Sequence, residues 1–259
     1  MKPLNPSQIT IGLTTFNRKN ILLKCLPSLK RLNPSHDFLI CDDCSTEYDS
    51  DFLITNFQNW RVYRSSINSG RADFAMARLM DLFIETGREY LVILDSDLLV
   101  DPDLTDFVCS NYYETDGVFS LFNTPSHSSI SEKGRWIIKN IVGAAATVWK
   151  KELLIEVRKN VPVTERYDWD WSQYLQDKGV NIYVSKRSYV QHLGFSSGQN
   201  SNNFLMGDLG LNFKKYGEEN LQIILDEYLH SERQYLKETI NTIHSRIINL
   251  ENIIAKIIN

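Results

Sequence analysis

The feature that most constrains the fold is a run of apolar residues that ends in two acids. Residues 90–94 read YLVIL, and Asp95-Ser96-Asp97 follows at once. An unbroken apolar run of this length is typical of a central strand that is buried on both faces of a parallel sheet. Parallel strands need long crossover connections, usually helices, so the rest of the chain should alternate between strands and helices.

The first half of the chain has this alternation. Further strands are predicted at 9–15, 37–41, 60–64 and 117–122, and helices at 21–32, 71–86 and 103–113. Pro27 should kink or shorten the first helix, because proline lacks the backbone N–H that a helix interior needs. The second half is less regular, with a loop at 123–135, an apolar segment at 137–149, a helix at 165–175, short strands at 180–184 and 188–191, and a polar segment at 196–203. The pattern predicts an α/β fold with a doubly wound, largely parallel sheet.

Composition narrows the class of protein. A chain of 259 residues with 42% hydrophobic residues suits one globular α/β domain with an appendage, or two small domains. The net charge of −4 argues against a basic surface for nucleic acid. The polar N-terminus lacks the features of a signal peptide, and no apolar run approaches the ~20 residues of a membrane helix. We therefore expect a cytoplasmic protein, and a peripheral association with the inner face of the membrane is compatible with this expectation.

Two cysteines, Cys41 and Cys44, form a C-x-x-C pattern around Asp42 and Asp43. Zinc would need further Cys or His ligands at a paired spacing, which the other two cysteines do not supply. A thioredoxin-like motif would open a helix and would not hold acids between its thiols. We expect reduced cysteines, and the two aspartates become the more informative pair.

Polar residues follow each predicted strand, at the sheet edge where open α/β sheets bind ligands. They are Thr15, Asn17, Asp42, Asp43, Asn68, Asp95 and Asp97. Asp95 and Asp97 point to the same side of an extended chain and repel each other unless a cation lies between them. Oxygen ligands of this kind favour Mg²⁺ or Mn²⁺, whereas the simpler alternative for a lone D-x-D is a solvated turn.

The order of these pieces resembles the inverting family 2 glycosyltransferases, which have a GT-A fold. The pieces are Thr15-Phe-Asn-Arg18, Asp42-Asp43-x-Ser45, Asn68-Ser-Gly70, Asp95-x-Asp97, Tyr167-Asp-Trp-Asp-Trp171 and Gln191-His-Leu-Gly194. The resemblance covers about residues 8 to 195. It implies a catalytic domain at 1–210, with a nucleotide-binding half at 8–122 and an acceptor-binding half at 123–210.

The resemblance also implies roles for individual residues. Asp97 and His192 would ligate the metal, and Asp95 would bind the ribose or reach the metal through water. Asp42 or Asp43 would accept the N3–H of uracil or contact the ribose. The other residues implied at the nucleotide sugar are Thr15, Asn17, Arg18, Asn68, Gly70, Arg71, Arg78 and Ser96.

The catalytic base is implied in the segment 167–171. The family pattern there is commonly Glu-Asp-x-Asp, and Tyr167 replaces the Glu. Aligned on the aspartates, Asp168 would be the base, and Asp170 and Glu165 remain the alternatives. Trp136 and Trp169 would stack on sugar rings, although core packing is the competing role for any tryptophan.

The implied function is a metal-dependent (Mn²⁺ or Mg²⁺) inverting hexosyl- or N-acetylhexosaminyltransferase. It would move a sugar from a nucleotide-diphosphate sugar, with UDP expected, to a hydroxyl of a glycan or polyol in bacterial surface polysaccharide or glycoconjugate synthesis. One alternative is a sugar nucleotidyltransferase, which would want a Gly-rich phosphate loop where Thr14-Thr-Phe-Asn17 has no glycine. The other is a sugar-nucleotide-binding assembly protein without transfer activity.

The C-terminal segment, 211–259, has a different pattern. Apolar residues repeat there with the spacing 4-3-4-3-4-3, at Leu236, Ile240, Ile243, Ile247, Leu250, Ile254 and Ile257. This is an a/d heptad seam, which either packs on its own domain or joins copies of the chain. We favour a coiled coil that makes a homo-oligomer through residues 218–258, and Ile at both a and d leans towards more than two chains.

Overall fold

The computed structural model describes residues 3–193, 209–213 and 217–258 of the chain. Its elements, in chain order, are η1 (Pro6–Gln8), β1 (Ile9–Thr15), α1 (Lys19–Leu29), β2 (Asp37–Asp42), α2 (Ser50–Asn56), β3 (Arg61–Arg64), α3 (Ala72–Ile84), β4 (Tyr90–Asp95), β5 (Leu98–Val100), α4 (Leu104–Asn111), η2 (Tyr112–Glu114), β6 (Val118–Ser120), β7 (Ser129–Lys133), β8 (Trp136–Lys139), β9 (Thr147–Lys150), α5 (Lys151–Asn160), α6 (Tyr167–Asp177), β10 (Ile182–Ser185), β11 (Val190–His192) and α7 (Gly217–Ile258). The alternation of strands and helices expected in the first half is confirmed.

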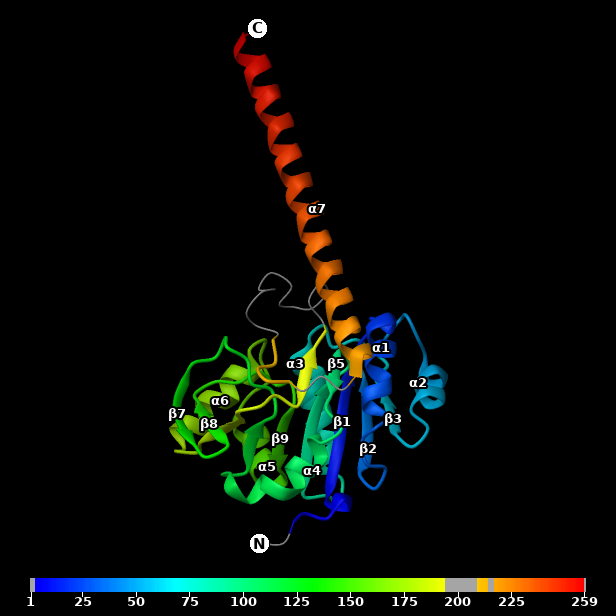
Figure 1. Cartoon of the computed structure of the whole chain (residues 1–259), viewed down its shortest axis with the longest axis vertical. Coiled ribbons are helices and arrows are strands. Elements are labelled where there is room, and N and C mark those ends of the chain that lie inside the picture. The colour runs from blue at the N-terminus through cyan, green and yellow to red at the C-terminus, as the bar shows by residue number, and fades with distance from the viewer. Residues whose placement is uncertain (1–2, 194–208, 214–216, 259) are drawn as a thin grey trace. The chain divides into compact units, whose positions relative to one another are not determined.

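A nine-stranded sheet in the order β3-β2-β1-β4-β9-β6-β10-β8-β7 forms the centre of the first unit of the chain (Figure 1). The pairs β1–β2, β1–β4, β2–β3 and β6–β10 are parallel. Strand β9 runs antiparallel between β4 and β6, and β8 runs antiparallel to β10 and β7. The expected mixed, mostly parallel sheet flanked by helices is thus confirmed.

The central strands face a hydrophobic core on each side of the sheet. On β4, Val92 and Leu94 lie in one core, and Leu91 and Ile93 lie in the other. Fully burying such a side chain stabilises the fold by about 1.5–3 kcal/mol. Helix α3 covers one face so closely that a Cβ at Gly12 of β1 would lie 2.8 Å from Cδ2 of Leu79. This close approach fixes α3 on the sheet, and with it the turn that precedes α3.

The structure contains elements that the sequence pattern did not predict, one of them, α2, in the first half and two, β7 and α5, in the second. Residues 129–133, expected within a loop, form β7 and pair with β8, although every residue of β7 is exposed. A strand without a buried face lacks the alternation that would reveal it in a sequence. Helices α2 and α5 were also not expected, because their buried residues are few: Leu53 in α2, and Leu154 and Val157 in α5.

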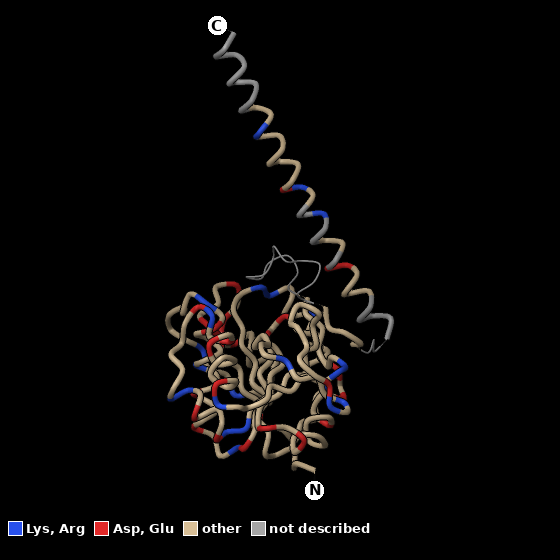
Figure 2. The backbone as a smooth tube through the Cα atoms, turned by 90° about the vertical axis from the view of Figure 1, so that its left-hand side faces the viewer, with Lys and Arg blue, Asp and Glu red and all other residues tan. Residues whose placement is uncertain are grey.

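The chain divides into two compact units, residues 1–193 with 205–214, and residues 194–204 with 215–259. In the first unit, acidic and basic residues are interspersed along the backbone (Figure 2). No helix in the described part of the chain is both long and apolar enough to cross a membrane. The expected polar segment at 196–203 lies outside the described residues.

Helix α7 carries the heptad seam of the second unit. Four seam residues have described side chains, and they are all exposed: Leu236 by 53%, Ile240 by 63%, Ile243 by 52% and Ile247 by 48%. The side chains of the other three seam residues, Leu250, Ile254 and Ile257, lie outside the described residues. The described part of the seam is therefore an apolar stripe that faces solvent in a single chain.

Candidate active site

The end of β4 brings together the two acids of the D-x-D pattern and a histidine from far along the chain. Asp95 is the last residue of β4, and Asp97 immediately precedes β5. Strand β11 pairs antiparallel with β5, and this register sets His192 opposite Leu98. Ligand atoms of Asp95, Asp97 and His192 consequently all lie within 4.8 Å of one another. Between the two acids, Ser96 is 3% exposed.

The two carboxylate oxygens of Asp97 have different partners. Its Oδ2 atom accepts a hydrogen bond of 2.7 Å from Nη1 of Arg18, and its Oδ1 atom lies 3.4 Å from Nε2 of His192. Burial acts to raise the pKa of Asp97, but His192 and Arg18 outweigh burial and lower this pKa. Burial and the charge of Asp97 raise the pKa of Asp95, which accepts a bond of 2.7 Å from Thr14.

The residues at this place fit a divalent cation. Oδ1 of Asp97 is buried and accepts no hydrogen bond from any described residue, although Nε2 of His192 lies 3.4 Å away. Such an atom is costly in a protein interior unless a ligand satisfies it. Two carboxylates suit Mn²⁺ or Mg²⁺, and the imidazole beside them slightly favours Mn²⁺.

The two aspartates at the end of β2, Asp42 in the strand and Asp43 just after it, have different partners. Asp42 is fully buried and accepts hydrogen bonds from Ser45 and from Nη1 of Arg64, the latter at 2.8 Å. Burial raises the pKa of Asp42, and its bonds to Ser45 and the charge of Arg64 oppose that rise. The carboxylate of Asp42 is therefore fully engaged in hydrogen bonds with other residues of the protein. Arg64 was not predicted, because the last residue of an exposed edge strand carries no signal of an internal partner.

Asp43 instead organises the turn that precedes α3. Its carboxylate accepts hydrogen bonds from the side chains of Asn68 at 3.1 Å and Ser69 at 2.7 Å, and from the backbone N–H of Ser69. Oδ1 of Asn68 accepts a bond of 2.8 Å from the N–H of Gly70, whose φ of +84° lies in the left-handed region. Glycine adopts this conformation without steric cost, which explains the Asn68-Ser69-Gly70 sequence.

The two arginines that were predicted near the diphosphate both follow this turn, Arg71 as the N-cap residue of α3 and Arg78 within that helix. Nη1 of Arg78 donates to Ser65 at 2.6 Å and lies 3.5 Å from Asp43. Arg71 pairs with Glu165 at 2.8 Å, and both side chains are largely exposed. Arg78 thus joins the cluster around Asp43, whereas Arg71 reaches towards the segment that precedes α6.

The loop after β1 is shaped by its polar residues. Asn17 and Arg18 have φ values of 50° and 52°, and Oδ1 of Asn17 accepts the backbone N–H of Thr46 at 2.7 Å and of Glu47 at 3.1 Å. Thr15 is 3% exposed and bonds to the hydroxyl of Tyr48. Asn17 therefore ties the β1 loop to the β2 loop, and Arg18 extends from that loop to Asp97.

The predicted base lies in the first turn of α6. Asp168 is the second residue of this helix, and its Oδ1 accepts the N–H of Trp169 at 2.9 Å. Burial, followed by the charge of Asp73, raises the pKa of Asp168 to about 6. Asp170, the alternative base, accepts a hydrogen bond from Thr164. The influence of Asp73 on the pKa of Asp168 was not predicted, because an acid in the first turn of a helix is common and gives no sign of a distant partner.

Tyr167, which stands where the family commonly has Glu, belongs to the core. It is fully buried, and its hydroxyl accepts a bond of 3.2 Å from Arg158, which also pairs with Asp81. Burial raises the pKa of Tyr167. Tyr167 therefore replaces an acid with a packed and neutral side chain at the start of α6.

The tryptophans fall into different surroundings. Trp169 is 44% exposed, with the guanidinium of Arg166 over its ring at 4.8 Å. Trp136 is only 1% exposed, and its ring packs edge-on against Phe107, Phe119 and Tyr183. Burial against these rings makes Trp136 a residue of the core, whereas Trp169 is exposed enough for the predicted stacking on a sugar.

The cysteines are free, as in the expectation of reduced thiols. Cys41 is fully buried, and burial raises the pKa of its thiol to about 12. Cys44 has a φ of 64° in the turn after β2 and donates to the carbonyl of Ser66 at 3.6 Å. Cys41 is thus an inert, protonated thiol and Cys44 a turn residue. Both observations agree with the interpretation that this C-x-x-C pattern has neither a metal-binding nor a redox role.

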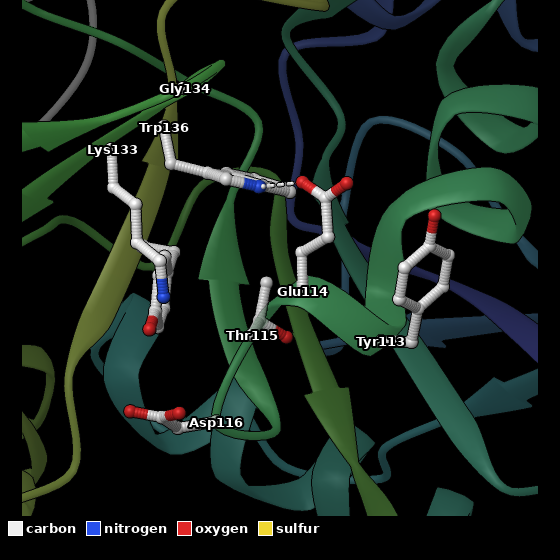
Figure 3. Close-up of a pocket in the computed structure, with 8 residues that line it drawn as sticks. Tyr113, Glu114, Thr115, Asp116, Lys133, Gly134 and Trp136 are labelled. Atoms are coloured by element: carbon white, nitrogen blue, oxygen red, sulfur yellow. Dashed lines mark hydrogen bonds between the residues drawn. The ribbon is translucent and has the colours of Figure 1, made fainter. Parts of the chain in front are cut away.

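A separate pocket of about 440 Å³ lies beside Trp136 (Figure 3). It is lined by Tyr113, Glu114, Thr115, Asp116, Lys133, Gly134, Trp136 and Tyr183. Figure 3 shows the indole N–H of Trp136 directed at Glu114, to which it donates at 2.7 Å. This pocket shares no residue with the carboxylate cluster at the end of β4, and we assign it no catalytic role.

Solved structures share this fold at low sequence identity. The S. aureus TarS 1–349 structure has a TM-score of 0.51 at 16% identity, and the alignment covers 71% of this chain and 59% of that one. A TarS 1–349 complex with UDP-GlcNAc has a TM-score of 0.51 at 17% identity, covering 71% and 57%. The mannosyltransferase PcManGT from Pyrobaculum calidifontis, in complex with GDP-Man and Mn²⁺, has a TM-score of 0.52 at 15% identity, covering 73% and 59%.

The family follows from the sequence match. No curated protein matches the chain, and the chain spans 59% of the length of the first of the similar structures. A family model described as "Glycosyl transferase family 2" matches residues 10–164, which is more than half of the chain. The sheet, the acids at its carboxyl edge and the similar structures agree with this match. The protein therefore has a GT-A fold and belongs to glycosyl transferase family 2.

Proposed function

We propose that the protein is a metal-dependent inverting glycosyltransferase that uses a nucleotide-diphosphate sugar, with a UDP-sugar as the expected donor. The observation that carries the proposal is the cluster of Asp95, Asp97 and His192, in which a buried oxygen of Asp97 accepts no hydrogen bond from the described residues. The enzyme would transfer a hexosyl or N-acetylhexosaminyl group to a hydroxyl of a glycan or polyol. It would do so in the cytoplasm, during the synthesis of a bacterial surface polysaccharide or glycoconjugate.

Asp97 and His192 would hold the Mn²⁺ or Mg²⁺ ion directly, and Asp95 would contact the ribose or reach the ion through water. When bound, the ion would neutralise charge on the diphosphate and stabilise the leaving nucleoside diphosphate. The Mn²⁺ in the complex of PcManGT supports a divalent ion on this fold. Arg18 pairs with Asp97 and would turn to the diphosphate when the donor binds.

Asp43 is the better candidate for the contact to the base or ribose of the nucleotide. Asp42 would first have to break its buried ion pair with Arg64. Asp43 lies with Asn68, Ser69 and Arg78, next to the turn that the family places near the nucleotide. We therefore assign Asp43, Asn68, Gly70 and Arg78 to the donor, together with Thr15, Asn17 and Ser96, and give Arg71 a lesser role.

Asp168 would act as the general base. The acceptor hydroxyl attacks the anomeric carbon, its proton passes to the carboxylate of Asp168, and the bond from that carbon to the diphosphate oxygen breaks. The nucleoside diphosphate leaves with the electron pair, and displacement from the opposite face inverts the anomeric carbon. A carboxyl group whose pKa is about 6 is mostly ionised at neutral pH and is a stronger base than an ordinary aspartate. Exposed Trp169, the next residue, would stack on the acceptor sugar.

The donor is tested by thermal shift with UDP-, GDP-, CMP- and dTDP-sugars in the presence of Mn²⁺, followed by analysis of the products. A ligand that binds only the folded protein raises the melting temperature. We expect the largest rise with a UDP-sugar, and release of UDP when an acceptor is added. Release of pyrophosphate would instead favour a nucleotidyltransferase. Binding without release of either product, across acceptors, would favour an assembly protein.

We also propose that α7 joins copies of the chain through its heptad seam. The exposed stripe of Leu236, Ile240, Ile243 and Ile247 has the spacing of a coiled coil, and a second copy is complementary to it because the same stripe recurs on each chain. Ile occupies both a and d positions, which favours more than two chains.

Charged residues in the seam should dissociate this oligomer. The double substitution Ile240→Glu and Ile243→Glu places carboxylates between the chains, and we expect the mass measured by light scattering to fall to that of one chain. Ile248→Glu is the matched control, because Ile248 is 45% exposed on the same helix and lies outside the seam. Equal masses for all three proteins would contradict the proposal.

A further inference from the structure

Strand β11, which carries His192, has little support from neighbouring strands. Among the described strands it pairs with β5 alone, over three residues, in a sheet separate from the nine-stranded one. The N–H of Leu193 donates to the carbonyl of Asp97 at 2.8 Å, and the N–H of Asp101 donates to the carbonyl of Tyr189 at 2.8 Å. A two-stranded pair is marginally stable by itself. The place of His192 beside Asp97 therefore depends on what else holds β11.

A short segment, residues 209–213, is tied to β11 and to the residue before Tyr189. The N–H of Gly210 donates to Oε1 of Gln191 at 3.0 Å. The carbonyl of Leu211 accepts the N–H of Ser188 at 2.8 Å, and the side chain of Leu211 is exposed. Backbone hydrogen bonds, more than burial of its own side chains, thus hold this segment in place.

Buried Asn123 anchors the same segment to the loop after β6. Its carbonyl accepts the N–H of Leu211 at 2.8 Å, and its N–H donates to the hydroxyl of Ser188 at 2.9 Å. The ammonium of Lys139 donates to Oδ1 of Asn123 at 3.0 Å, and both residues are buried. Buried groups that are bonded in this way have few alternative arrangements. The 209–213 segment is therefore a fixed support.

Gly210 makes the closest contact between this segment and β11. A Cβ at Gly210 would lie 2.5 Å from the carbonyl oxygen of Val190 and 3.0 Å from Cβ of Ser188. Both neighbours are fully buried, so neither can move aside without disturbing the core. Glycine is thus required where the two backbones meet, and a larger residue would push β11 and the segment apart.

Gln191 carries this contact on to the metal-binding histidine. Its Oε1 atom accepts the N–H of Gly210, and its Nε2 atom donates to the backbone carbonyl of His192 at 2.9 Å. Successive side chains of a strand point to opposite faces, so Gln191 acts on His192 through the backbone. The side chain of Gln191 is buried, and bonds at both ends of its amide fix its orientation.

We propose that Gly210 and Gln191 are positioning residues for the metal site: they hold the backbone of β11 so that Nε2 of His192 stays beside Oδ1 of Asp97, at 3.4 Å. This inference rests on the proposed function, in which His192 and Asp97 hold the ion. Neither Gly210 nor Gln191 touches the ion or the donor in this scheme. Groups that orient a metal ligand influence affinity nearly as much as the ligands themselves.

Two substitutions loosen this support in different ways. Gly210→Ala forces the two backbones apart, and Gln191→Leu removes the amide bridge without adding a clash. We expect each to weaken Mn²⁺ binding to the nucleotide-free protein by about tenfold, measured by isothermal titration. Gly87→Ala is the matched control and should bind Mn²⁺ like the wild type, because a Cβ at Gly87 has no neighbouring atom within 4 Å.

A double-variant cycle separates positioning from general loss of structure. His192→Ala weakens Mn²⁺ binding if His192 is a ligand, and Gly210→Ala should then cause no further loss in that background. An equal loss with and without His192 would overturn the inference, because the substitution would then act on the site as a whole.

Hydrogen exchange of the Leu193 amide, followed by NMR on the full-length protein, gives a readout that needs no metal. This amide donates to Asp97, so its exchange reports the opening of β11 from that residue. We expect faster exchange in Gly210→Ala and in Gln191→Leu, and no change in Gly87→Ala. A wild-type protein that binds no Mn²⁺ would refute the proposed metal site. Unchanged Leu193 exchange in both variants would instead overturn the inference about Gly210 and Gln191.

Discussion

Replacing Asp97 with Asn is expected to abolish Mn²⁺ binding in the absence of nucleotide and to lower kcat/KM by at least about 10²-fold. The buried Oδ1 atom of Asp97 has no hydrogen-bond donor among the described residues, and Oδ2 is paired with Arg18. An amide at this position is a poor ligand and leaves Arg18 without its counter-charge. Isothermal titration with Mn²⁺ and an assay for released nucleoside diphosphate measure the two effects, and circular dichroism checks the fold.

Two further variants sharpen this experiment. Arg18→Gln removes the cation that competes for Asp97, so Mn²⁺ should bind the nucleotide-free protein about fivefold more tightly, as expected for a part-exposed ion pair worth about 1 kcal/mol. The same variant should bind the donor less tightly, because Arg18 is proposed to turn to the diphosphate. Asp106→Asn, an exposed acid of α4, is the control and should change neither property. Full activity of Asp97→Asn, or of the wild type in excess EDTA, would refute the metal site.

Replacing Asp168 with Asn should leave donor binding intact and reduce turnover by about 10²–10⁴-fold, the usual contribution of a general base. An amide cannot accept the proton of the acceptor hydroxyl at neutral pH. In the wild type, the carboxyl of Asp168 has a pKa of about 6, so kcat should rise as the pH increases through about 6 and then level off. The measurements are kcat as a function of pH and donor affinity by titration.

Two other acids of α6, Asp170 and Asp177, serve as comparisons for this variant. Asp170→Asn should have a small effect on turnover. Asp170 already accepts a hydrogen bond from Thr164, and its expected role is to cap or orient the start of α6. Asp177→Asn changes an exposed acid at the other end of α6 and should have no effect. Loss of turnover in Asp170→Asn with retention in Asp168→Asn would transfer the role of base to Asp170.

Local pattern predicted much of the first half of the fold. Strand β4 could be identified because its residues are buried on both faces, and α3 because its apolar residues repeat at helical spacing. Strand β7 could not, since all of its residues are exposed and only its pairing with β8 makes it a strand. Trp136 could not be assigned either, because an aromatic ring suits a sugar and a hydrophobic core equally well until its neighbours are known.

The sequence by itself determined the kinds of group that the site has to offer. Acids and amides follow the apolar strands, and parallel strands bring their carboxyl ends to one edge of the sheet. Only the tertiary structure decided which of these groups face one another. The pairing of β11 with β5 brings His192 to Asp97, and the guanidinium of Arg64 neutralises the buried carboxylate of Asp42. The reason is physical: periodicity and burial are recorded locally in the chain, whereas contacts between distant segments depend on strand order and on how each helix packs against the sheet.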